Sequence, residues 1–259
     1  KLDKLNEFFL NEDSNNNLDV YDKQLLMDLK DKYPEGEILK YFTNSVDFQC
    51  VIGKNVHTKR YTIIIRGSES YSDWLYNSFV LKKNVYELFP ETSKDEIKNK
   101  NIKIHSGFYK MIATDNIHIQ IVEYLKILLE ETPDWEIYFT GHSMGSATST
   151  LLSYLMAKTL FKTKITVIAL ASPKIGNLQF KNDYNNIPNL RLYRICYKKD
   201  IVTSYPSFYY HVGHCYHFIK NKWIFFDKTN NIPCKIYNYW NPFDHPCKLY
   251  IEAIKEFKH

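Results

Sequence analysis

The chain has 259 residues, enough for one large α/β domain with its own core and no need for a second. Hydrophobic residues make up 44% and charged residues 24%, as in ordinary globular proteins. The net charge of +5 is spread along the chain, with an acidic run at 91–96 directly before a basic run at 98–103. This pattern argues against a nucleic-acid partner and leaves a transient attraction to anionic lipid surfaces open.

The cysteines and the first residues constrain cofactors and localisation only weakly. Five cysteines show no C-x-x-C spacing, and no calcium-loop motif is present, so we expect neither a metal nor another cofactor. No apolar run reaches the roughly 18 residues of a membrane helix. The first residues, 1–4, include neither an initiator Met nor a hydrophobic signal core. Localisation therefore stays open between a secreted mature form and a trimmed chain, and so does the oligomeric state.

The predicted elements alternate between strands and helices along most of the chain. In order, they are a helix at 18–29, strands at 48–52 and 61–65, a helix at 117–129, a strand at 135–139, a helix at 146–160, strands at 165–170 and 190–197, a hairpin at 216–226 and a helix at 243–257. The strand at 165–170 is unbroken apolar sequence, which is expected where both faces of a sheet are covered. The alternation indicates an α/β fold with a largely parallel sheet.

One motif between two of these elements carries chemistry. Residues 141–145, Gly-His-Ser-Met-Gly, match G-x-S-x-G and join the predicted strand at 135–139 to the predicted helix at 146–160. In that setting, the motif forms a tight turn that exposes the serine hydroxyl at the end of the strand. Small residues at 146–149 would let the helix pack close to the strand. The sequence therefore predicts that Ser143 is a nucleophile.

A serine hydroxyl becomes a good nucleophile when a histidine takes its proton and a carboxylate orients that histidine. With this motif, the chain order is serine, acid, histidine. The acid is expected in a loop just past a strand, and Asp200 follows the predicted strand at 190–197. Its alternative role is that of a turn or capping residue. Other candidate acids are Asp183 in a polar loop, Asp227 at the end of the hairpin and Asp244 beside a histidine.

Four histidines are candidates for the base. His245 is preferred because the junction at 241–246 between a loop and a helix would present its side chain into a cleft. The cluster of His211, His214 and His217 invites a metal site. However, His214 and His217 on one strand would face opposite sides, and no carboxylate accompanies them. We interpret this cluster as packing and surface residues, and a metal-dependent hydrolase is the least favoured hypothesis.

Several blocks, taken in order from about Phe48 to Tyr250, resemble the class 3 lipases, a family of fungal triacylglycerol lipases with plant and protist relatives. These blocks lie at 65–68 with 73–74, at 105–109, at 141–147, at 171–177, at 194–206 with 211–213, and at 244–245 with Tyr250. The resemblance implies an α/β-hydrolase fold, with a mostly parallel central sheet flanked by helices and a short helical lid. It implies one domain over 1–259, with the lid and its flanks at 69–104.

The resemblance also assigns roles to individual residues. Ser143 would attack the ester, His245 would act as base and then as acid, and Asp200 would orient His245. The backbone N–H of Met144, with the N–H and hydroxyl of Ser68, would form the oxyanion hole. In the same comparison His211 is a structural histidine near the acid loop, and His142 packs beneath the serine turn. Three positions depart from the family pattern without removing a catalytic group: Ser146, Thr203 and Asn77.

A possible lid follows the first oxyanion residue. Tyr71, Trp74, Leu75, Ser78 and Phe79 recur at helical spacing, which gives one aromatic-rich face. Taken alone, the spacing fits a core-facing helix equally well. The resemblance favours a lid that covers the serine in water and turns towards lipid at an interface. The charged segment at 80–103 is either a lid flank or a surface loop.

Together these observations predict a serine-dependent carboxylic-ester hydrolase that acts on acylglycerols or other lipid esters at a lipid–water interface. Two hypotheses differ only in substrate: a phospholipase A1 and another acyl-ester hydrolase such as a feruloyl esterase. A third is a catalytically inactive lipase-like protein that binds lipid or a protein partner. That hypothesis requires the loss of a triad member, whereas Ser143, Asp200 and His245 are all present.

Overall fold

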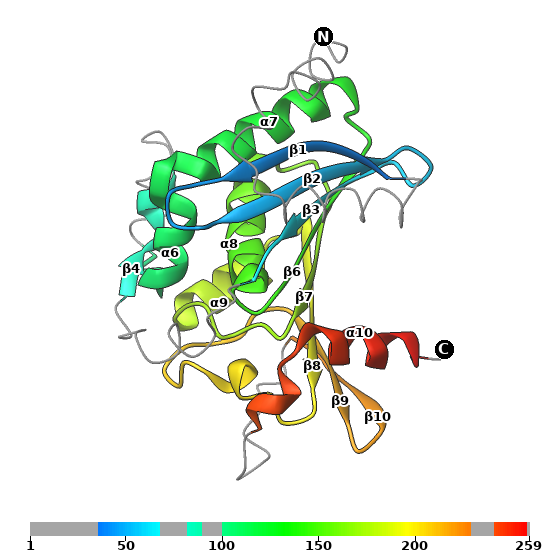
Figure 1. Cartoon of the computed structure of the whole chain (residues 1–259). Helices are drawn as coiled ribbons and strands as arrows, with labels where there is room; N and C mark the ends of the chain where they lie inside the picture. The colour runs from blue at the N-terminus through cyan, green and yellow to red at the C-terminus, as the bar shows by residue number, and fades with distance from the viewer. Residues whose placement is uncertain (1–35, 68–81, 90–99, 229–240, 258–259) are drawn as a thin grey trace.

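The computed structural model describes residues 36–67, 82–89, 100–228 and 241–257, and Figure 1 shows their arrangement. These residues form a twisted eight-stranded sheet in the order β1-β2-β3-β6-β7-β8-β9-β10. The strands are β1 (Glu37–Thr43), β2 (Gln49–Asn55), β3 (Arg60–Ile65), β6 (Glu136–His142), β7 (Ile165–Leu170), β8 (Leu190–Tyr197), β9 (His214–Ile219) and β10 (Lys222–Phe226). The run from β3 to β9 is parallel, and antiparallel strands close both edges. The predicted α/β-hydrolase architecture is confirmed.

Helices cover one face of the sheet, on the left in Figure 1. They are α6 (Ser106–Ala113), α7 (Ile117–Glu131), α8 (Met144–Thr159) and α9 (Leu178–Asn185). Although α8 is rich in Ser and Thr, residues 144–157 are all buried. Its hydroxyl groups donate to backbone carbonyls, as from Thr150 to Ser146 and, across to β6, from Ser149 to Thr140. These bonds satisfy the polar groups, so small residues can bring α8 close to the strands beneath it.

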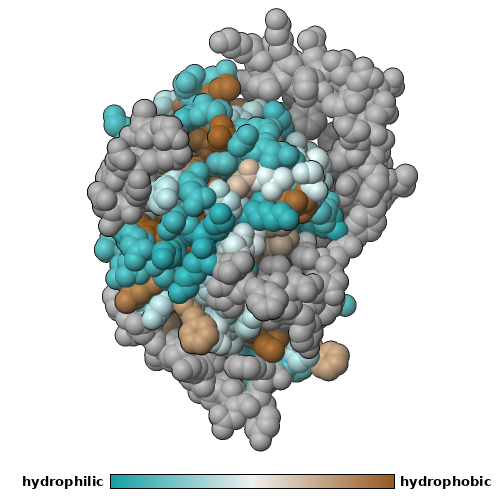
Figure 2. Space-filling view, turned by 90° about the vertical axis from the view of Figure 1, so that its left-hand side faces the viewer, coloured by the Kyte–Doolittle hydropathy of each residue, from teal (hydrophilic) through white to brown (hydrophobic). Residues whose placement is uncertain are grey.

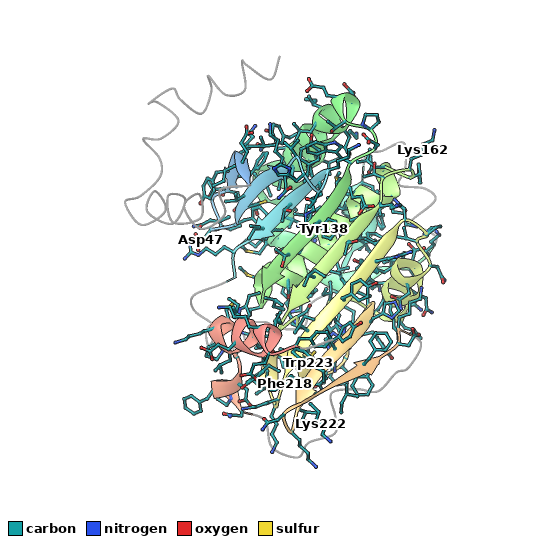
Figure 3. The ribbon with its side chains drawn as sticks, turned by 90° about the vertical axis from the view of Figure 1, so that its right-hand side faces the viewer. Asp47, Tyr138, Lys162, Phe218, Lys222 and Trp223 are labelled. Atoms are coloured by element: carbon teal, nitrogen blue, oxygen red, sulfur yellow. The ribbon has the colours of Figure 1, made fainter. Side chains whose placement is uncertain are left out.

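The opposite face of the sheet is seen in Figure 3, where α10 (Cys247–Lys255) lies across the end of the sheet near Phe218 and Trp223. Tyr250 and Ala253 of α10 pack there with Tyr197 and Phe218 in a second, smaller core. The side chain of Tyr250 is fully buried. This packing holds the C-terminal helix beside the end of β8, where the candidate acid lies.

Most predicted strands and helices lie within a few residues of where the sequence placed them, although β1, α6 and α9 were not predicted. Three further expectations were wrong. Alternate residues of β7 are only half-buried, so this strand is less covered on one face than its apolar sequence suggested. The last helix begins at Cys247, after the 3-10 turn η4 (Pro242–Asp244) and Pro246, and not at residue 243. Asp183 lies within α9 and not in a loop. The predicted helix at 18–29 lies outside the described residues.

Part of the segment that was predicted to flank the lid is anchored in the core. β4 (Lys82–Asn84) pairs with β5 (Lys103–His105), and the 3-10 turn η1 (Val85–Leu88) joins them to the main core. Val85, Leu88 and Phe89 are buried. Ser68 and the predicted lid residues Tyr71, Trp74 and Leu75 lie outside the described residues. None of the helices in the described part of the chain is long and apolar enough to cross a membrane.

Candidate active site

Ser143 lies at the sharp turn between β6 and α8, and its backbone is held in an unusual conformation. Its φ is 58° and its ψ is −122°, a region that L-residues rarely adopt. Its N–H donates to the carbonyl of Leu170 on the neighbouring strand at 3.0 Å. The two flanking glycines have a steric role. A Cβ at Gly141 would lie 2.5 Å from the carbonyl carbon of Gly145, and a Cβ at Gly145 would collide with the carbonyl oxygen of Ile65.

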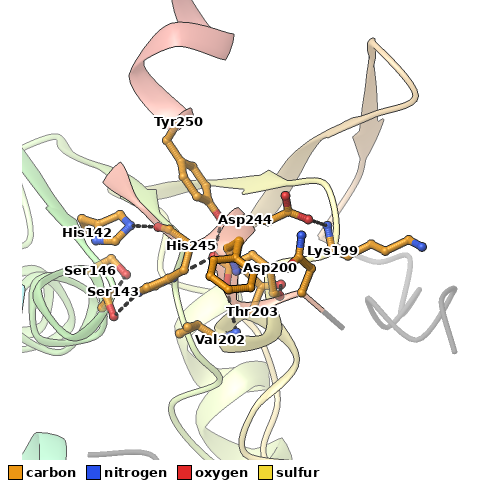
Figure 4. Close-up of polar contacts among 12 residues, drawn as sticks. His142, Ser143, Ser146, Lys199, Asp200, Val202, Thr203, Asp244, His245 and Tyr250 are labelled. Atoms are coloured by element: carbon orange, nitrogen blue, oxygen red, sulfur yellow. Dashed lines mark hydrogen bonds and ion pairs between the residues drawn. The ribbon is translucent and has the colours of Figure 1, made fainter. Parts of the chain in front are cut away.

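Figure 4 shows the three predicted triad side chains side by side. The Ser143 hydroxyl donates to Nε2 of His245 at an Oγ–Nε2 distance of 3.0 Å. Nδ1 of His245 in turn donates to Oδ2 of Asp200 at 2.9 Å. All three residues are buried, Asp200 most deeply, with 2% of its surface exposed. Residues separated by up to 102 positions in the sequence therefore form one continuous chain of hydrogen bonds.

Asp200 makes two further hydrogen bonds that fix its orientation. Its Oδ1 accepts from the backbone N–H of Val202 at 2.9 Å, where Asp200 caps the 3-10 turn η3 (Ile201–Ser204). Its Oδ2 also accepts from the hydroxyl of Tyr250 at 2.5 Å. Burial, together with the Asp200 carboxylate, raises the pKa of Tyr250 well above its usual value, so the tyrosine stays a donor. The oxygen that faces His245 is thus held by a second, permanent hydrogen bond.

The segment that carries His245 is fastened to the segment that carries Asp200. Asp244 accepts through Oδ2 from the backbone N–H of Lys199 at 3.1 Å. The N–H of Asn241 donates to the carbonyl of Lys199 at 3.0 Å. Asp244 was a candidate acid, but its carboxylate faces Lys199 and holds two loops together. The resulting rigidity keeps Nδ1 of His245 opposite Asp200.

His142 contacts the candidate base directly. Its Nε2–H donates to the carbonyl of His245 at 2.8 Å, and the centroids of the two rings are 4.6 Å apart. Burial, and then the nearby His245, lower the pKa of His142 to about 4. At neutral pH, His142 is therefore an uncharged positioning group. It was expected to pack beneath the serine turn, and the structure adds the bond to the His245 backbone.

The three histidines of the cluster at 211–217 each contact a different partner. His211 donates from Nε2 to the carbonyl of Thr203 in η3 at 2.6 Å, and His217 donates to the carbonyl of Lys198 at 2.7 Å. Nδ1 of His214 lies 3.2 Å from Oδ2 of Asp227, so the expectation that no carboxylate accompanies the cluster was wrong for this histidine. Within the described ranges, no group of three His, Cys, Asp or Glu residues could hold a metal ion.

One of the two predicted oxyanion donors can be examined. Met144 is the first residue of α8, so its N–H points out of the helix and has no acceptor in a preceding turn. The next turn is closed by the N–H of Ser146 and of Ala147, which both donate to the carbonyl of Ser143. The hydroxyl of Ser146 donates to the same carbonyl at 2.7 Å, which stiffens the turn. Ser146, one of the positions that depart from the family pattern, is fully buried.

The chain is similar in sequence to plant proteins named phospholipases A1. Phospholipase A1-II 3 of Oryza sativa subsp. indica is 34% identical over 114 residues, 40% of this chain and 27% of the rice protein. Phospholipase A1-IIgamma of Arabidopsis thaliana is 25% identical over 165 residues, 56% of this chain and 38% of that protein. The chain thus matches less than two thirds of the length of these relatives.

Solved structures extend the comparison to the fold. A lipase from Rhizopus microsporus var. chinensis aligns with a TM-score of 0.69 at 19% identity, over 83% of this chain and 75% of that chain. A native Rhizomucor miehei lipase propeptide complex aligns with a TM-score of 0.69 at 18% identity, over 83% and 69%. These matches show a shared α/β-hydrolase fold. Residues 62–210, more than half of the chain, match the family described as Lipase (class 3), so the chain belongs to the class 3 lipase family.

Proposed function

We propose that this protein is a serine-dependent carboxylic-ester hydrolase that acts on lipid esters through Ser143, His245 and Asp200. The observation that carries the proposal is the buried hydrogen-bond chain from Ser143 Oγ through both ring nitrogens of His245 to Asp200. A solved neighbour with a TM-score of 0.70 is described as a triacylglycerol lipase whose catalytic centre is a serine protease triad. An inactive lipase-like protein has no need to keep this complete arrangement.

The first half of the reaction would form an acyl-enzyme. Ser143 Oγ attacks the ester carbonyl carbon while Nε2 of His245 takes the hydroxyl proton. Asp200 stabilises the imidazolium that results, and Tyr250 keeps the accepting oxygen of Asp200 in place. The imidazolium then gives its proton to the alcohol oxygen of the substrate, the C–O bond breaks and the alcohol leaves.

The second half would restore the enzyme. Nε2 of His245 takes a proton from water, the hydroxide attacks the acyl carbon, and the carboxylic acid leaves as Ser143 regains its proton. In both halves, negative charge develops on the former carbonyl oxygen. The N–H of Met144 and the N–H and hydroxyl of Ser68 are the proposed donors to that oxygen, and losing one such donor costs about 3–4 kcal/mol in the barrier.

Phospholipid is a specific second candidate for the substrate. The curated relatives reported above are named phospholipases A1, whereas several structural neighbours are triacylglycerol lipases. Both reactions use the same attack on an acyl carbonyl and differ only in how the rest of the lipid is bound. We propose triacylglycerol hydrolysis first, as the resemblance in the sequence implies, and phospholipase A1 activity second, as the names of the sequence relatives suggest.

The decisive experiment compares the wild-type protein with Ser143→Ala on short and long p-nitrophenyl esters and on emulsified triglyceride. We expect kcat to fall by roughly 10⁴- to 10⁶-fold in the variant, because the nucleophile is lost while the fold remains. Ser45→Ala is a control, since it removes an exposed serine hydroxyl in the turn between β1 and β2, outside the proposed catalytic groups. A wild-type protein that leaves every ester and the emulsion intact would contradict the proposal.

The substrate class needs a second assay. Wild-type protein is incubated with phosphatidylcholine that carries distinguishable acyl chains at its two positions. Preferential release of the sn-1 chain, abolished in Ser143→Ala, would move phospholipase A1 activity to first place. Triglyceride hydrolysis without phospholipid hydrolysis would leave the lipase assignment standing.

A further inference from the structure

Two buried thiols that take no part in the proposed chemistry lie in contact on neighbouring strands. Sγ of Cys215 on β9 lies 3.6 Å from Sγ of Cys196 on β8, although the two residues are 19 positions apart in the sequence. Cys196 is 1% and Cys215 is 4% exposed. Both are thiols in the structure. We call these two residues the thiol pair.

The register of the sheet explains this contact. β8 and β9 are parallel, and Cys215 lies beside Arg194. Cys196 is two residues further along β8, so it faces the same side of the sheet as Arg194. Leu192 faces this side too and belongs to the main core, which places the thiol pair on the face that the helices cover. Figure 2 views the molecule from this side, where the thiol pair is buried beneath a largely hydrophilic described surface.

The separation of the two sulfurs is close to what a disulfide needs. An S–S bond is roughly 2.05 Å long, so the sulfurs have to approach each other by about 1.5 Å. Rotation about the Cα–Cβ bonds moves both sulfurs without moving the backbone. Because β8 and β9 are paired strands, the two backbones stay beside each other while the protein is folded.

A cavity gives a small reagent a route to the thiol pair. The cavity of about 720 Å³ beside the start of α9 is lined by Arg194 and Gly213, each of which precedes one of the two cysteines by two positions. Nη1 of Arg194 donates to Sγ of Cys196 at 3.8 Å. The side chain of Arg194 therefore reaches from the cavity wall to the sulfur. A donor to sulfur also stabilises the thiolate, which is the attacking form in disulfide exchange.

The thiol pair encloses the loop that carries the candidate acid. Residues 197–214 include Asp200, the 3-10 turn η3, and His211, which donates to the carbonyl of Thr203. The far end of the loop continues into the hairpin of β9 and β10, at one edge of the sheet. An edge hairpin has a strand on one side only, so it opens locally at less cost than the central strands. A bond between β8 and β9 would hold the ends of the loop together during such opening.

From this geometry we propose that Cys196 and Cys215 are a disulfide site, and that closing it stabilises the loop of Asp200. The oxidant is a small organic disulfide. The Cys196 thiolate attacks one sulfur of the reagent, and one reagent thiolate leaves. The Cys215 thiolate then attacks Sγ of Cys196, the new S–S bond forms, and the second reagent thiolate leaves. The two protein thiols lose two electrons and two protons, and the reagent is reduced to two thiols.

The first test maps the cross-link in the full chain. Folded, reduced protein is incubated with hydroxyethyl disulfide, the remaining thiols are blocked with iodoacetamide in denaturant, and the protein is digested without reduction. We expect mass spectrometry to find a peptide pair that joins Cys196 to Cys215 and has lost two hydrogen atoms. No cross-linked pair, or a bond from either residue to another cysteine, would overturn the proposal.

The second test measures the effect of the bond on stability. The melting temperature of the cross-linked protein should be about 5–10 °C higher than that of the reduced protein, because closing a loop of about 20 residues lowers the entropy of the unfolded chain. Reduction with dithiothreitol should reverse the rise. A mapped cross-link without this rise would contradict the stabilising role.

Two variants serve as matched probes of the same effect. Cys215→Ala should abolish the rise in melting temperature, whereas Cys50→Ala, which removes a buried thiol on β2, should retain it. Each variant is compared with itself before and after oxidation, so that any loss of stability from the substitution cancels. If Cys215→Ala does not fold, the mapping and the melting temperatures of the wild-type protein still decide.

Esterase activity separates this proposal from the proposed function. The kcat on p-nitrophenyl esters should be equal in the reduced and the cross-linked protein at room temperature. The half-life of activity just below the melting temperature should be several times longer in the cross-linked protein. A chain that cleaves no ester would contradict the proposed function alone, because the mapping and the melting temperatures do not depend on turnover.

Discussion

Two carboxylates in this protein each accept a hydrogen bond from a tyrosine, yet their surroundings differ. Asp200 accepts from Tyr250 at 2.5 Å, and Asp183 accepts from Tyr154 at 2.7 Å. Lys158 and Lys100 also hold Asp183, at 2.8 and 3.1 Å. Burial acts in the opposite direction, but hydrogen bonds from Lys158, Tyr154 and Lys100 lower the pKa of Asp183.

The difference lies in the positive partner. Asp183 forms ion pairs with two lysines, and these pairs join α8, α9 and the residues before β5. Asp200 faces a histidine, which in the proposed mechanism gains a positive charge when it takes the serine proton. In that mechanism the carboxylate gains most from its partner at the moment when charge develops.

The largest effect should come from neutralising each carboxylate in turn. Asp200→Asn should lower kcat on p-nitrophenyl esters by about 10⁴-fold, because the amide favours the wrong tautomer of His245. Asp183→Asn should leave kcat within about threefold of wild type and cost about 1–3 kcal/mol of unfolding free energy. The measurements are steady-state kinetics and urea unfolding. Equal losses of kcat in the two variants would contradict the proposed difference in role between Asp200 and Asp183.

On acidification, the region around Asp200 and the ion pairs of Asp183 should lose their contributions to stability in different pH ranges. Because the pKa of His142 is lowered from 6.5 to about 4 in the folded state, its contribution is fully present above pH 6.5 and is lost as the pH falls towards 4. The loss amounts to up to about 3 kcal/mol. His105, whose pKa burial also lowers to about 4, should contribute in the same window. His142→Asn, which retains a side-chain donor, should flatten the curve of unfolding free energy between pH 6.5 and 4.

Asp183 should lose its contribution to the free energy of unfolding at a lower pH than His142. Its folded-state pKa lies below the ordinary value of 3.8, so its ion pairs stabilise the fold above that pH and are lost as the pH falls through the folded pKa. Asp183→Asn should therefore flatten the unfolding curve only below about pH 4. If Asp183→Asn changed the slope of unfolding free energy against pH near pH 6, the predicted order of the two pH ranges would be wrong.

The smallest predicted effect on kcat comes from removing the hydroxyl group of one tyrosine at a time. Tyr250→Phe removes the hydroxyl bond to Asp200 and should lower kcat about tenfold with KM nearly unchanged, since the bond supports the charged form in the transition state. Tyr154→Phe removes the corresponding bond to Asp183 and should leave kcat unchanged. Matching melting temperatures in the two variants would exclude a general loss of fold as the cause.

The fold was predictable in its repeating part, because strands and helices alternate with clear apolar patterns. β7 and β8 begin and end at the predicted residues. The strands β1, β4 and β5 and the helices α6 and α9 were not predicted. The sequence of α9 is mostly polar, and the helix is stabilised by tertiary contacts such as the stacking of Tyr184 on Tyr154. Tertiary packing thus overrode weak local preference.

The candidate site was predictable to the extent that its residues follow a motif or a chain order. Ser143, Asp200 and His245 could be named, but the bonds from Tyr250 and His142 could not, because they join residues 50 and 103 positions apart. The role of Asp244 could not be predicted either. Its partner is a backbone amide 45 positions away, and a backbone amide leaves no signal in the sequence. Ser68 and the lid residues stay predictions, because they lie outside the described residues.

The order of strands in the sheet also bears on how the protein folds. Every parallel pair, such as β3 with β6, joins segments that are separated in sequence, and His245 lies between the last 3-10 turn and the last helix of the described residues. Contacts between residues that are far apart in sequence form late, because the entropy cost of closing a long loop comes before the contact can stabilise the fold. On dilution from denaturant, helical circular dichroism should therefore return before esterase activity. Regained turnover would mark the last step of folding, when the C-terminal segment docks on a sheet already formed.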